Sequence, residues 1–253
     1  MNLTATFRER LRARQLVFGT FFKTPAYQLV EVLGGAGLDF IVIDAEHAAF
    51  DRAQLDVCLL AARASALPAL VRVQSSSASH ILDALDLGAT GIVAPHAKTV
   101  QGVRAIEAAA RYRAGERGFS NSPRAGNYGL VNMHDHLERS DRDNVVVCQI
   151  EDREAVDNIR EIAALDEADC LFIGRADLAV SYGVYDVAHP LVKKAVLDVC
   201  EVGRRNGKSI GIHIGHMREA KAYLELGVSM FIVGSEQSLL RAAILDMRQH
   251  LTV

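Results

Sequence analysis

The sequence lacks the features of a secreted or membrane-spanning protein. Its four cysteines, Cys58, Cys148, Cys170 and Cys200, stand far apart inside apolar segments and form neither a CxxC metal pattern nor a disulfide framework. No apolar run approaches the roughly 18 to 20 residues of a spanning helix, and the N-terminal stretch MNLTATFRERLRARQ has no apolar core of the kind a signal peptide needs. We therefore expect a cytoplasmic protein with reduced thiols that begins with a short basic helix.

An excess of positive charge is also lacking. The net charge of −3 argues against nucleic acid or an anionic membrane as the main partner. Hydrophobic content of 50% with 23% charged residues is ordinary for a globular protein. The length of 253 residues suits one large domain or two small ones. Small molecules are the expected partners.

Eight short apolar runs alternate with amphipathic stretches along the whole chain. The runs are rich in Val, Ile, Leu and Phe, as expected for parallel strands covered on both faces. They lie at 16–22, 40–44, 68–73, 91–95, 145–150, 170–174, 209–214 and 230–234, and helical patterns follow them at 27–33, 54–63, 78–87, 100–110, 153–162, 191–206, 218–226 and 237–251.

This alternation predicts the fold. Eight units of about 32 residues match the usual size of a (β/α)8 barrel, so we predict one such α/β domain, a TIM barrel, over residues 1–253. An open doubly wound sheet is the alternative, but no GxGxxG turn follows the first strand.

Residues 111–144 break the rhythm, because they hold few periodic apolar positions and many Gly, Ser, Asn and Arg residues. We expect a long loop, which in a compact domain is usually functional or mobile. Its Arg113, Arg117 and Arg124 could recognise an anion or simply be solvated surface.

Polar residues follow almost every predicted strand, where the active sites of such barrels lie. This convergence from distant parts of the sequence predicts an enzyme. The residues are Lys23, Asp44, Glu46, His47, Arg72, His96, Gln149, Glu151, Arg175, Asp177, His213, His216, Ser235 and Glu236.

Glu151 and Asp177 are the candidate metal ligands among them. Mg²⁺ and Mn²⁺ take oxygen ligands, commonly one or two carboxylates. Alternatively, Glu151 caps the helix that begins near Arg153, and Asp177 caps the turn after GRAD, because acidic residues favour helix N-termini. Two carboxylates after adjacent strands favour the metal site.

His47 is the candidate general base, since its ordinary pKa near 6.5 suits proton transfer at neutral pH. Asp44 or Glu46 could orient it. The alternative is that Asp44 or Asp51 caps the next helix and His47 fills a loop. Arg72 directly ends an apolar strand, so its guanidinium has to meet an anion or a water-filled cleft, and a substrate carboxylate would satisfy it.

Together these segments resemble the HpcH/HpaI aldolases, metal-dependent aldolases that act on pyruvate-type substrates. The resemblance rests on DFIVIDAEH, VRV, VCQIEDREAVDNI and FIGRADLAVSYG, with RYRAGERG and the HP at 189–190 as lesser landmarks, in matching order over about residues 18–240.

The resemblance implies a (β/α)8 barrel in which Glu151 and Asp177 hold Mg²⁺, Mn²⁺ or Co²⁺ and pyruvate binds that metal ion. Arg72 would contact the keto oxygen and stabilise the enolate. His47, paired with Asp44, would be the acid/base.

The resemblance also implies that Gln149 lies near the substrate and that the Ala176 backbone contacts its carboxylate. An acidic residue of the neighbouring subunit, at the position of Asp86, would approach the site. The expected assembly is a homohexamer built from dimers that exchange their last helix.

Three positions depart from the family pattern. Arg175 replaces the proline of the usual GPADL segment, and it either pairs with a surface acid or binds an anionic substrate. His213 stands where an apolar residue commonly lines the aldehyde pocket, so it too is a candidate substrate-binding residue. His96 follows Pro95 where an apolar residue is expected.

The leading functional hypothesis is a class II aldolase that reversibly cleaves a 4-hydroxy-2-oxo acid to pyruvate and an aldehyde. One alternative is a citrate-synthase-like or citryl- or malyl-CoA lyase-like enzyme acting on oxaloacetate or an acyl-CoA. Another is a barrel without catalysis, which the intact set of polar residues disfavours. A Schiff-base mechanism is disfavoured because no lysine ends the sixth strand, although Lys23 and Lys98 lie near other strand ends.

Overall fold

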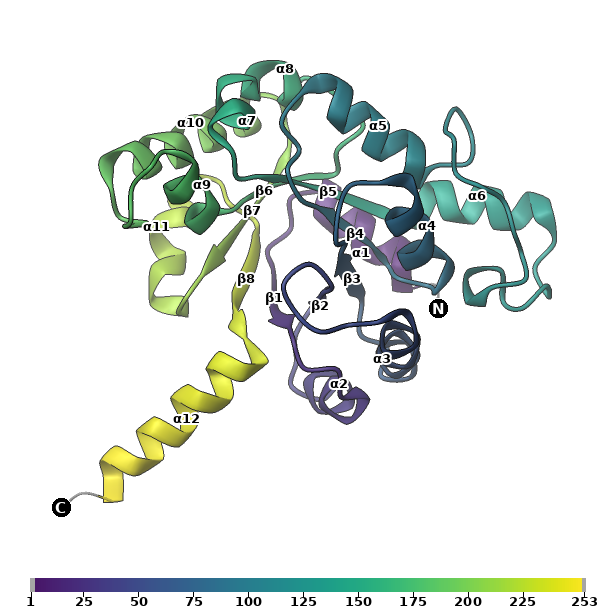
Figure 1. The fold of residues 1–253 in the computed structure, drawn as a ribbon, viewed down its shortest axis with the longest axis horizontal. Helices are drawn as coiled ribbons and strands as arrows, with labels where there is room; N and C mark the ends of the chain where they lie inside the picture. Colours follow the sequence, from purple (N-terminus) through teal and green to yellow (C-terminus); the bar gives the residue numbers. More distant parts are fainter. Residues whose placement is uncertain (1–2, 252–253) are drawn as a thin grey trace.

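Eight parallel strands close into a barrel in the computed structural model, which describes residues 3–251 (Figure 1). Each strand pairs with the next in sequence, and β1 pairs with β8. The predicted (β/α)8 barrel is confirmed, and the open sheet is wrong. The strands are β1 (Val17–Phe22), β2 (Phe40–Asp44), β3 (Ala69–Arg72), β4 (Gly91–Ala94), β5 (Val145–Ile150), β6 (Cys170–Ile173), β7 (Ser209–Ile214) and β8 (Met230–Ser235).

Side chains alternate along each strand between two apolar clusters, as the period of two requires. One cluster lies between the strands and the surrounding helices and includes Ile41 and Ile43. The other fills the barrel interior and includes Val42, Leu70 and Val147. Residues two positions further along these strands therefore point into the same interior, at its carboxyl end.

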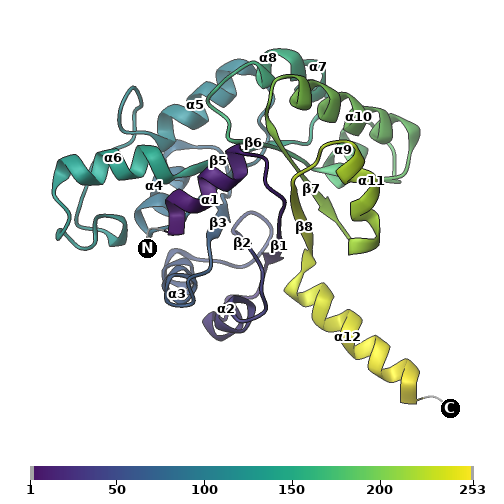
Figure 2. The same cartoon turned by 180° about the vertical axis from the view of Figure 1, so that it is seen from behind.

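Helix α1 closes the opposite, amino-terminal end of the barrel (Figure 2). Its Phe7 and Leu11 are buried in the interior cluster, and the Phe7 ring lies 5.4 Å from that of Phe40. Arg8 fixes the helix by donating from Nε to both oxygens of the buried Asp169 at 2.9 and 3.0 Å. A basic lead-in helix was predicted here, and Leu3–Arg12 confirms it; residues 1–2 lie outside the described range.

The outer helices follow the predicted pattern closely. Some of them begin at a capping side chain, and Asp51 caps α3 in a reciprocal pair with Gln54. The helices are α2 (Tyr27–Gly34), α3 (Arg52–Ala64), α4 (Ala78–Asp86), α5 (Val100–Ala110), α7 (Arg153–Asp157), α8 (Ile159–Ala163), α9 (Arg175–Ser181), α10 (Pro190–Arg205), α11 (Ala220–Glu225) and α12 (Glu236–Leu251), with a short 3₁₀ turn η2 (Met217–Glu219).

Two sequence expectations need correction. Residues 111–144 are not one long loop, because they contain a 3₁₀ turn, η1 (Arg124–Gly126), and a helix, α6 (Met133–Asp143). Helix α6 is polar except for Met133 and Leu137, too few to give a helical apolar periodicity, and Asn132 caps it. The single helix expected at 153–162 is interrupted at Asn158, which separates α7 from α8.

Helix α12 extends away from the barrel (Figure 1). Of its described side chains only Glu236 is buried. Several large apolar side chains along it are exposed, namely Leu239, Leu240, Ile244, Leu245, Met247 and Leu251. An apolar surface of this size on a helix that packs on little of its own chain marks an interaction surface.

No helix among the described residues is long and apolar enough to cross a membrane. The four cysteines are free and buried, as their apolar surroundings predicted.

Candidate active site

Three predicted site residues lie at the carboxyl end of the barrel, because each follows an interior-facing position of its strand. Asp44 and Arg72 come two residues after the interior residues Val42 and Leu70, and Gln149 comes two after Val147. All three side chains are at least nine-tenths buried.

Arg72 and Asp44 form the central pair of this rim. The register of β2 and β3 places the two residues side by side. Arg72 donates from Nε and Nη2 to the two oxygens of Asp44 at 2.9 and 2.8 Å, and its guanidinium lies 4.5 Å from the centre of the Phe21 ring. The Nζ of Lys23 lies 3.1 Å from the same carboxylate. The anion that Arg72 had to meet is therefore Asp44.

The carboxylate of Asp44 stays ionised in this environment. Burial alone would raise its pKa, but the hydrogen bond and charge of Arg72, the backbone N–H of His47 and the nearby Lys23 together hold the pKa below its usual value. Asp44 thus fixes both the Arg72 guanidinium and the backbone at the start of the loop that carries His47.

The His47 ring lies beside Glu46 rather than Asp44. Its Nε2 is 3.7 Å from Glu46 Oε2. The contact between His47 and Asp44 is instead a hydrogen bond from the His47 backbone N–H to the Asp44 carboxylate, at 3.1 Å. The expectation that Asp44 pairs with the ring is wrong, because Arg72 occupies both of its oxygens. Glu46, the other predicted partner, lies where it can orient the imidazole. The His47 side chain is 55% exposed, so it can exchange protons with solvent.

Glu151 is buried at the end of β5 with little to neutralise it. The His96 backbone N–H donates to its Oε1 at 2.9 Å, and Gln149 Nε2 donates to its Oε2. Burial raises the pKa of Glu151 to about 7, with the negative charges of Asp177 and Glu46 adding to the effect. Its side chain does not cap helix α7, whose N-cap is Asp152, so the capping alternative is wrong.

Asp177 is half-buried in the first turn of α9, close enough to raise the pKa of Glu151 through its charge. The two predicted metal ligands, Glu151 and Asp177, are thus close enough for their charges to interact. Two ionised carboxylates close together repel each other, and a bound cation would remove that cost. Such a pair is therefore suited to binding a metal ion.

A second group of possible ligands was missed from the sequence. Nδ1 of His96 lies 3.3 Å from Glu151 Oε1 and 2.9 Å from Asp152 Oδ2, and these three side chains offer ligand atoms within 4.8 Å of one another. Asp152 also pairs with Lys98 at 3.1 Å. The signal for it was His96 after Pro95, which departed from the expected apolar residue.

The Arg175 guanidinium is held by partners within the protein, the alternative to its predicted contact with substrate. Its guanidinium donates to the Tyr223 hydroxyl at 2.7 Å, to the His213 carbonyl at 2.9 Å and to Glu219 Oε2 at 3.0 Å. These contacts tie the start of α9 to β7, η2 and α11. The alternative considered from the sequence, an arginine paired with an acid, is the one that the structure has.

His213 lines the barrel mouth as an uncharged imidazole. Its ring lies 5.6 Å from that of Phe21. Burial, together with the charges of Arg175 and Arg72, lowers the pKa of His213 to about 4. At neutral pH it therefore offers a hydrogen-bonding group without a charge.

Replacing His213 by glutamine should reduce the dependence of stability on acid. Because the folded-state pKa is depressed, the neutral ring stabilises the fold above the unfolded pKa of about 6.5, and this contribution disappears as pH falls toward 4. The difference in unfolding free energy between wild type and His213→Gln should shrink by about 1–3 kcal/mol from pH 7 to 4, an estimate discounted for partial exposure. Denaturant titrations at several pH values measure it, and a constant difference would contradict it.

Asp86 does not belong to the rim of its own chain. It ends α4, at the amino-terminal end of the barrel, and is 8% exposed. Arg117 Nη2 donates to it at 2.8 Å, and the buried Arg117 guanidinium lies 4.5 Å from the centre of the Tyr112 ring. Arg117 is thus structural rather than solvated surface.

A parallel barrel with an arginine and several carboxylates at its carboxyl rim is the architecture of a barrel enzyme. Comparison with known proteins agrees. The profile of the HpcH/HpaI aldolase/citrate lyase family matches residues 18–243, and the chain belongs to this family. It is therefore an enzyme, a carbon–carbon lyase of the aldolase kind, and aldolases of the family depend on a divalent metal ion.

Individual relatives cover nearly the whole chain. The 5-keto-4-deoxy-D-glucarate aldolase of Shigella boydii serotype 18 is 34% identical over 239 residues, which are 94% of this chain and 92% of the relative. A family protein from Burkholderia cenocepacia J2315 has a TM-score of 0.93 at 30% identity, covering 98% of this chain and 100% of its own. The citrate synthase SbnG has a TM-score of 0.85 at 29% identity, covering 96% and 97%.

Proposed function

We propose that this enzyme reversibly cleaves a 4-hydroxy-2-oxo acid of the 5-keto-4-deoxy-D-glucarate type to pyruvate and an aldehyde. The observation that carries the proposal is the buried Glu151, whose pKa is raised chiefly by burial and further by the charges of Asp177 and Glu46, at the same rim as the Arg72 guanidinium. Cleavage of a carbon–carbon bond beside a keto group needs a site that stabilises the negative charge developing on the keto oxygen. The name of the Shigella boydii relative supports the substrate class.

The donor set fits a hard divalent cation such as Mg²⁺, Mn²⁺ or Co²⁺. Glu151 and Asp177 would hold the ion, since oxygen ligands that follow adjacent strands suit it and a cation would offset the negative charge by which Asp177 raises the pKa of Glu151. When bound, the ion would supply a Lewis acid that polarises the keto oxygen of the substrate. His96 and Asp152 form the competing ligand pair.

Arg72 is positioned to bind the substrate oxygen on which charge develops. Its bonds to Asp44 use Nε and Nη2, which leaves Nη1 to donate to a ligand. Because Asp44 and Phe21 hold the guanidinium in place, little reorganisation is needed during reaction.

Three further groups complete the proposed site. His47, oriented by Glu46, takes or returns the proton of the hydroxyl group at the aldehyde carbon. Gln149 has a buried Oε1 without a hydrogen-bond partner, so it can accept from a substrate hydroxyl or water. The backbone N–H of Ala176 would contact the substrate carboxylate.

A direct assay tests the substrate class. The purified protein with Mg²⁺ or Mn²⁺ is mixed with 5-keto-4-deoxy-D-glucarate, and pyruvate release is followed by coupled reduction to lactate. We expect metal-dependent release that chelation stops. Absence of release, with turnover of oxaloacetate and an acyl-CoA instead, would favour the citrate-synthase-like alternative. That alternative is supported by the similarity to SbnG, but Arg175 no longer favours it because its guanidinium is already paired.

Substituting Gly174 by alanine should disturb the proposed metal site without unfolding the barrel. A Cβ at this position would lie 2.9 Å from Glu151 Cβ and 3.2 Å from its Oε2, and the backbone φ of −94° is one that alanine adopts. The Glu151 carboxylate must therefore shift. We expect a fall in kcat/KM of about tenfold to a hundredfold, as for misplaced metal ligands, with a retained far-UV circular dichroism spectrum. Activity equal to wild type would contradict the placement of Glu151.

We also propose that α12 exchanges between subunits of a hexamer, in which Asp86 would approach a neighbouring site. The exposed apolar side chains of α12 support this. Leu240→Glu combined with Ile244→Glu should lower the mass measured by light scattering, whereas Arg248→Glu, a charged position on the same helix, should not.

Buried reduced cysteines and reaction on central metabolites are consistent with the cytoplasm.

A further inference from the structure

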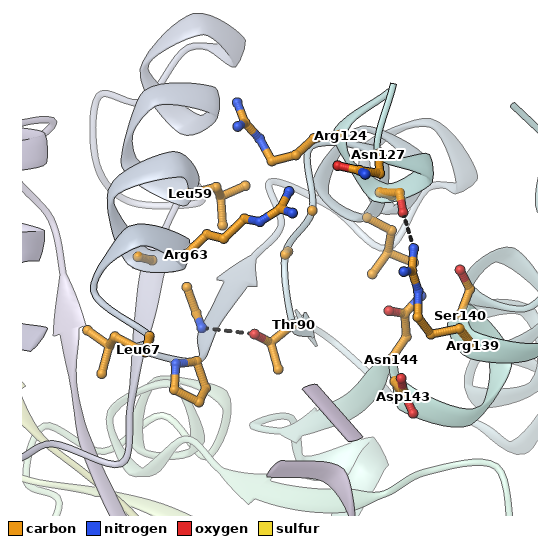
Figure 3. A pocket seen from close by; sticks show the side chains of 18 residues that line it. Leu59, Arg63, Leu67, Thr90, Arg124, Asn127, Arg139, Ser140, Asp143 and Asn144 are labelled. Atoms are coloured by element: carbon orange, nitrogen blue, oxygen red, sulfur yellow. Dashed lines mark hydrogen bonds between the residues drawn. The ribbon is translucent and has the colours of Figure 1, made fainter. Parts of the chain in front are cut away.

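A cavity of about 310 Å³ lies at the opposite end of the barrel from the proposed active site (Figure 3). It is bounded by the end of α3, the starts of β3 and β4, the η1 turn and α6. These segments meet at the amino-terminal ends of the strands, so the cavity has no part in the rim that holds Arg72 and Glu151.

Three arginines from three separate segments line this cavity: Arg63 from α3, Arg124 from η1 and Arg139 from α6. Arg124 is 8% exposed and anchored by Asp56 Oδ1 at 2.6 Å and the Leu87 carbonyl at 3.1 Å. Arg139 donates from Nη2 to the Ala125 carbonyl at 2.6 Å, which leaves its other donors available.

The Arg63 side chain has no hydrogen bond or ion pair with any of the described residues. In Figure 3 its side chain extends from α3 across the cavity, between Leu59 and the segment that holds Thr90. The one acidic residue in the lining, Asp143, is engaged by Arg142 at 2.7 Å. The cavity therefore carries uncompensated positive charge.

Part of the remaining wall is apolar, formed by side chains such as Leu59, Leu67, Pro68 and Leu85, and the polar residues Thr90, Asn127, Ser140 and Asn144 line the rest. A concave site with an apolar wall and a few convergent charged groups is typical of a small-molecule site. Guanidinium groups bind carboxylates and phosphates through paired, charge-assisted hydrogen bonds. An ion with a short carbon skeleton would use both features.

We propose that this cavity binds a small organic dianion, either a short dicarboxylate or a phosphate monoester, through Arg63, Arg124 and Arg139. Such a ligand would bridge α3 to η1 and α6, which lie far from α3 in the sequence, and would stabilise residues 111–144 against the barrel. This site is separate from the catalytic one and does not depend on the proposed function.

Isothermal titration calorimetry on the whole, metal-free protein tests the proposal, with succinate and glycerol 3-phosphate as probes at constant ionic strength. We expect saturable binding of at least one probe, and the stronger of the two identifies the dianion class. Arg63→Met and Arg139→Met should each weaken binding about tenfold or more, as expected for a lost charge-assisted contact. Arg104→Met, an exposed arginine on α5 outside the lining, serves as the matched control and should bind as wild type does.

The location is tested with Arg72→Lys, which alters the catalytic rim alone. Unchanged binding by this variant supports the remote cavity. Binding that disappears in Arg72→Lys but survives in Arg63→Met and Arg139→Met would place the anion at the catalytic rim and overturn the proposal. Equal binding by the Arg63, Arg139 and Arg104 variants, or no saturable binding of either probe, would overturn it as well.

Discussion

Glu151→Gln should reduce metal-dependent turnover by about a thousandfold or more while leaving the barrel folded. The substitution keeps the shape of the side chain and its hydrogen bond from the His96 backbone, but it removes the negative charge that a divalent ion requires. Lewis-acid stabilisation is worth several kcal/mol of barrier, and about 1.4 kcal/mol corresponds to a factor of ten. The measurement is pyruvate release across a range of Mn²⁺ concentrations, with thermal unfolding as the check on folding.

Two neighbouring acids provide matched variants for this experiment. Asp177→Asn should cause a comparable loss. Asp152→Asn should retain most activity, because Asp152 is already paired with Lys98 and His96. The opposite result would assign the metal ion to the His96, Glu151 and Asp152 group. Undiminished activity of Glu151→Gln in chelator-treated buffer would remove Glu151 from the mechanism altogether.

Arg72→Lys should lower kcat/KM by about a hundredfold to a thousandfold although it conserves charge. A lysine cannot bind both Asp44 oxygens and still present a fixed donor to substrate, and it loses the contact over the Phe21 ring. Loss of one preorganised donor to a developing oxyanion has an effect of this size. Steady-state kinetics with the best substrate measure the change.

Arg175→Lys is the control for that variant, because the guanidinium of Arg175, another arginine that follows a strand, donates several hydrogen bonds. Its contacts with Tyr223 and Glu219 are structural, so we expect a lower melting temperature with kcat/KM within about threefold of wild type. A near-normal rate for Arg72→Lys, or a larger loss for Arg175→Lys, would contradict the assignment of the two arginines.

Much of the architecture follows from patterns that the sequence carries locally. Apolar runs of strand length, separated by helical periodicity, predict the eight-unit barrel, and the period of two within a strand determines which residues face its interior. The sequence pattern therefore predicts that Asp44, Arg72 and Gln149 lie at the carboxyl rim. Their strand positions alone bring them together.

Side-chain pairing was harder to predict, since it depends on which partners compete. Asp44 pairs with Arg72 instead of the His47 ring because the strand register brings a guanidinium beside it. Arg175 turns toward Glu219 on a segment some forty residues away in sequence, a contact that no local pattern encodes. The polar helix α6 escaped detection because its few buried side chains are themselves polar.

Exchange of the C3 methyl protons of pyruvate in D₂O is the most direct test of the central claim, that this rim generates an enolate with the help of a divalent ion. NMR follows the methyl signal in chelator-treated protein before and after Mn²⁺ or Mg²⁺ is restored, and no knowledge of the aldehyde is needed. We expect rapid exchange that requires the metal ion and is lost in Glu151→Gln. Exchange no faster than in buffer with any metal ion, or equally fast in chelator-treated protein, would contradict it.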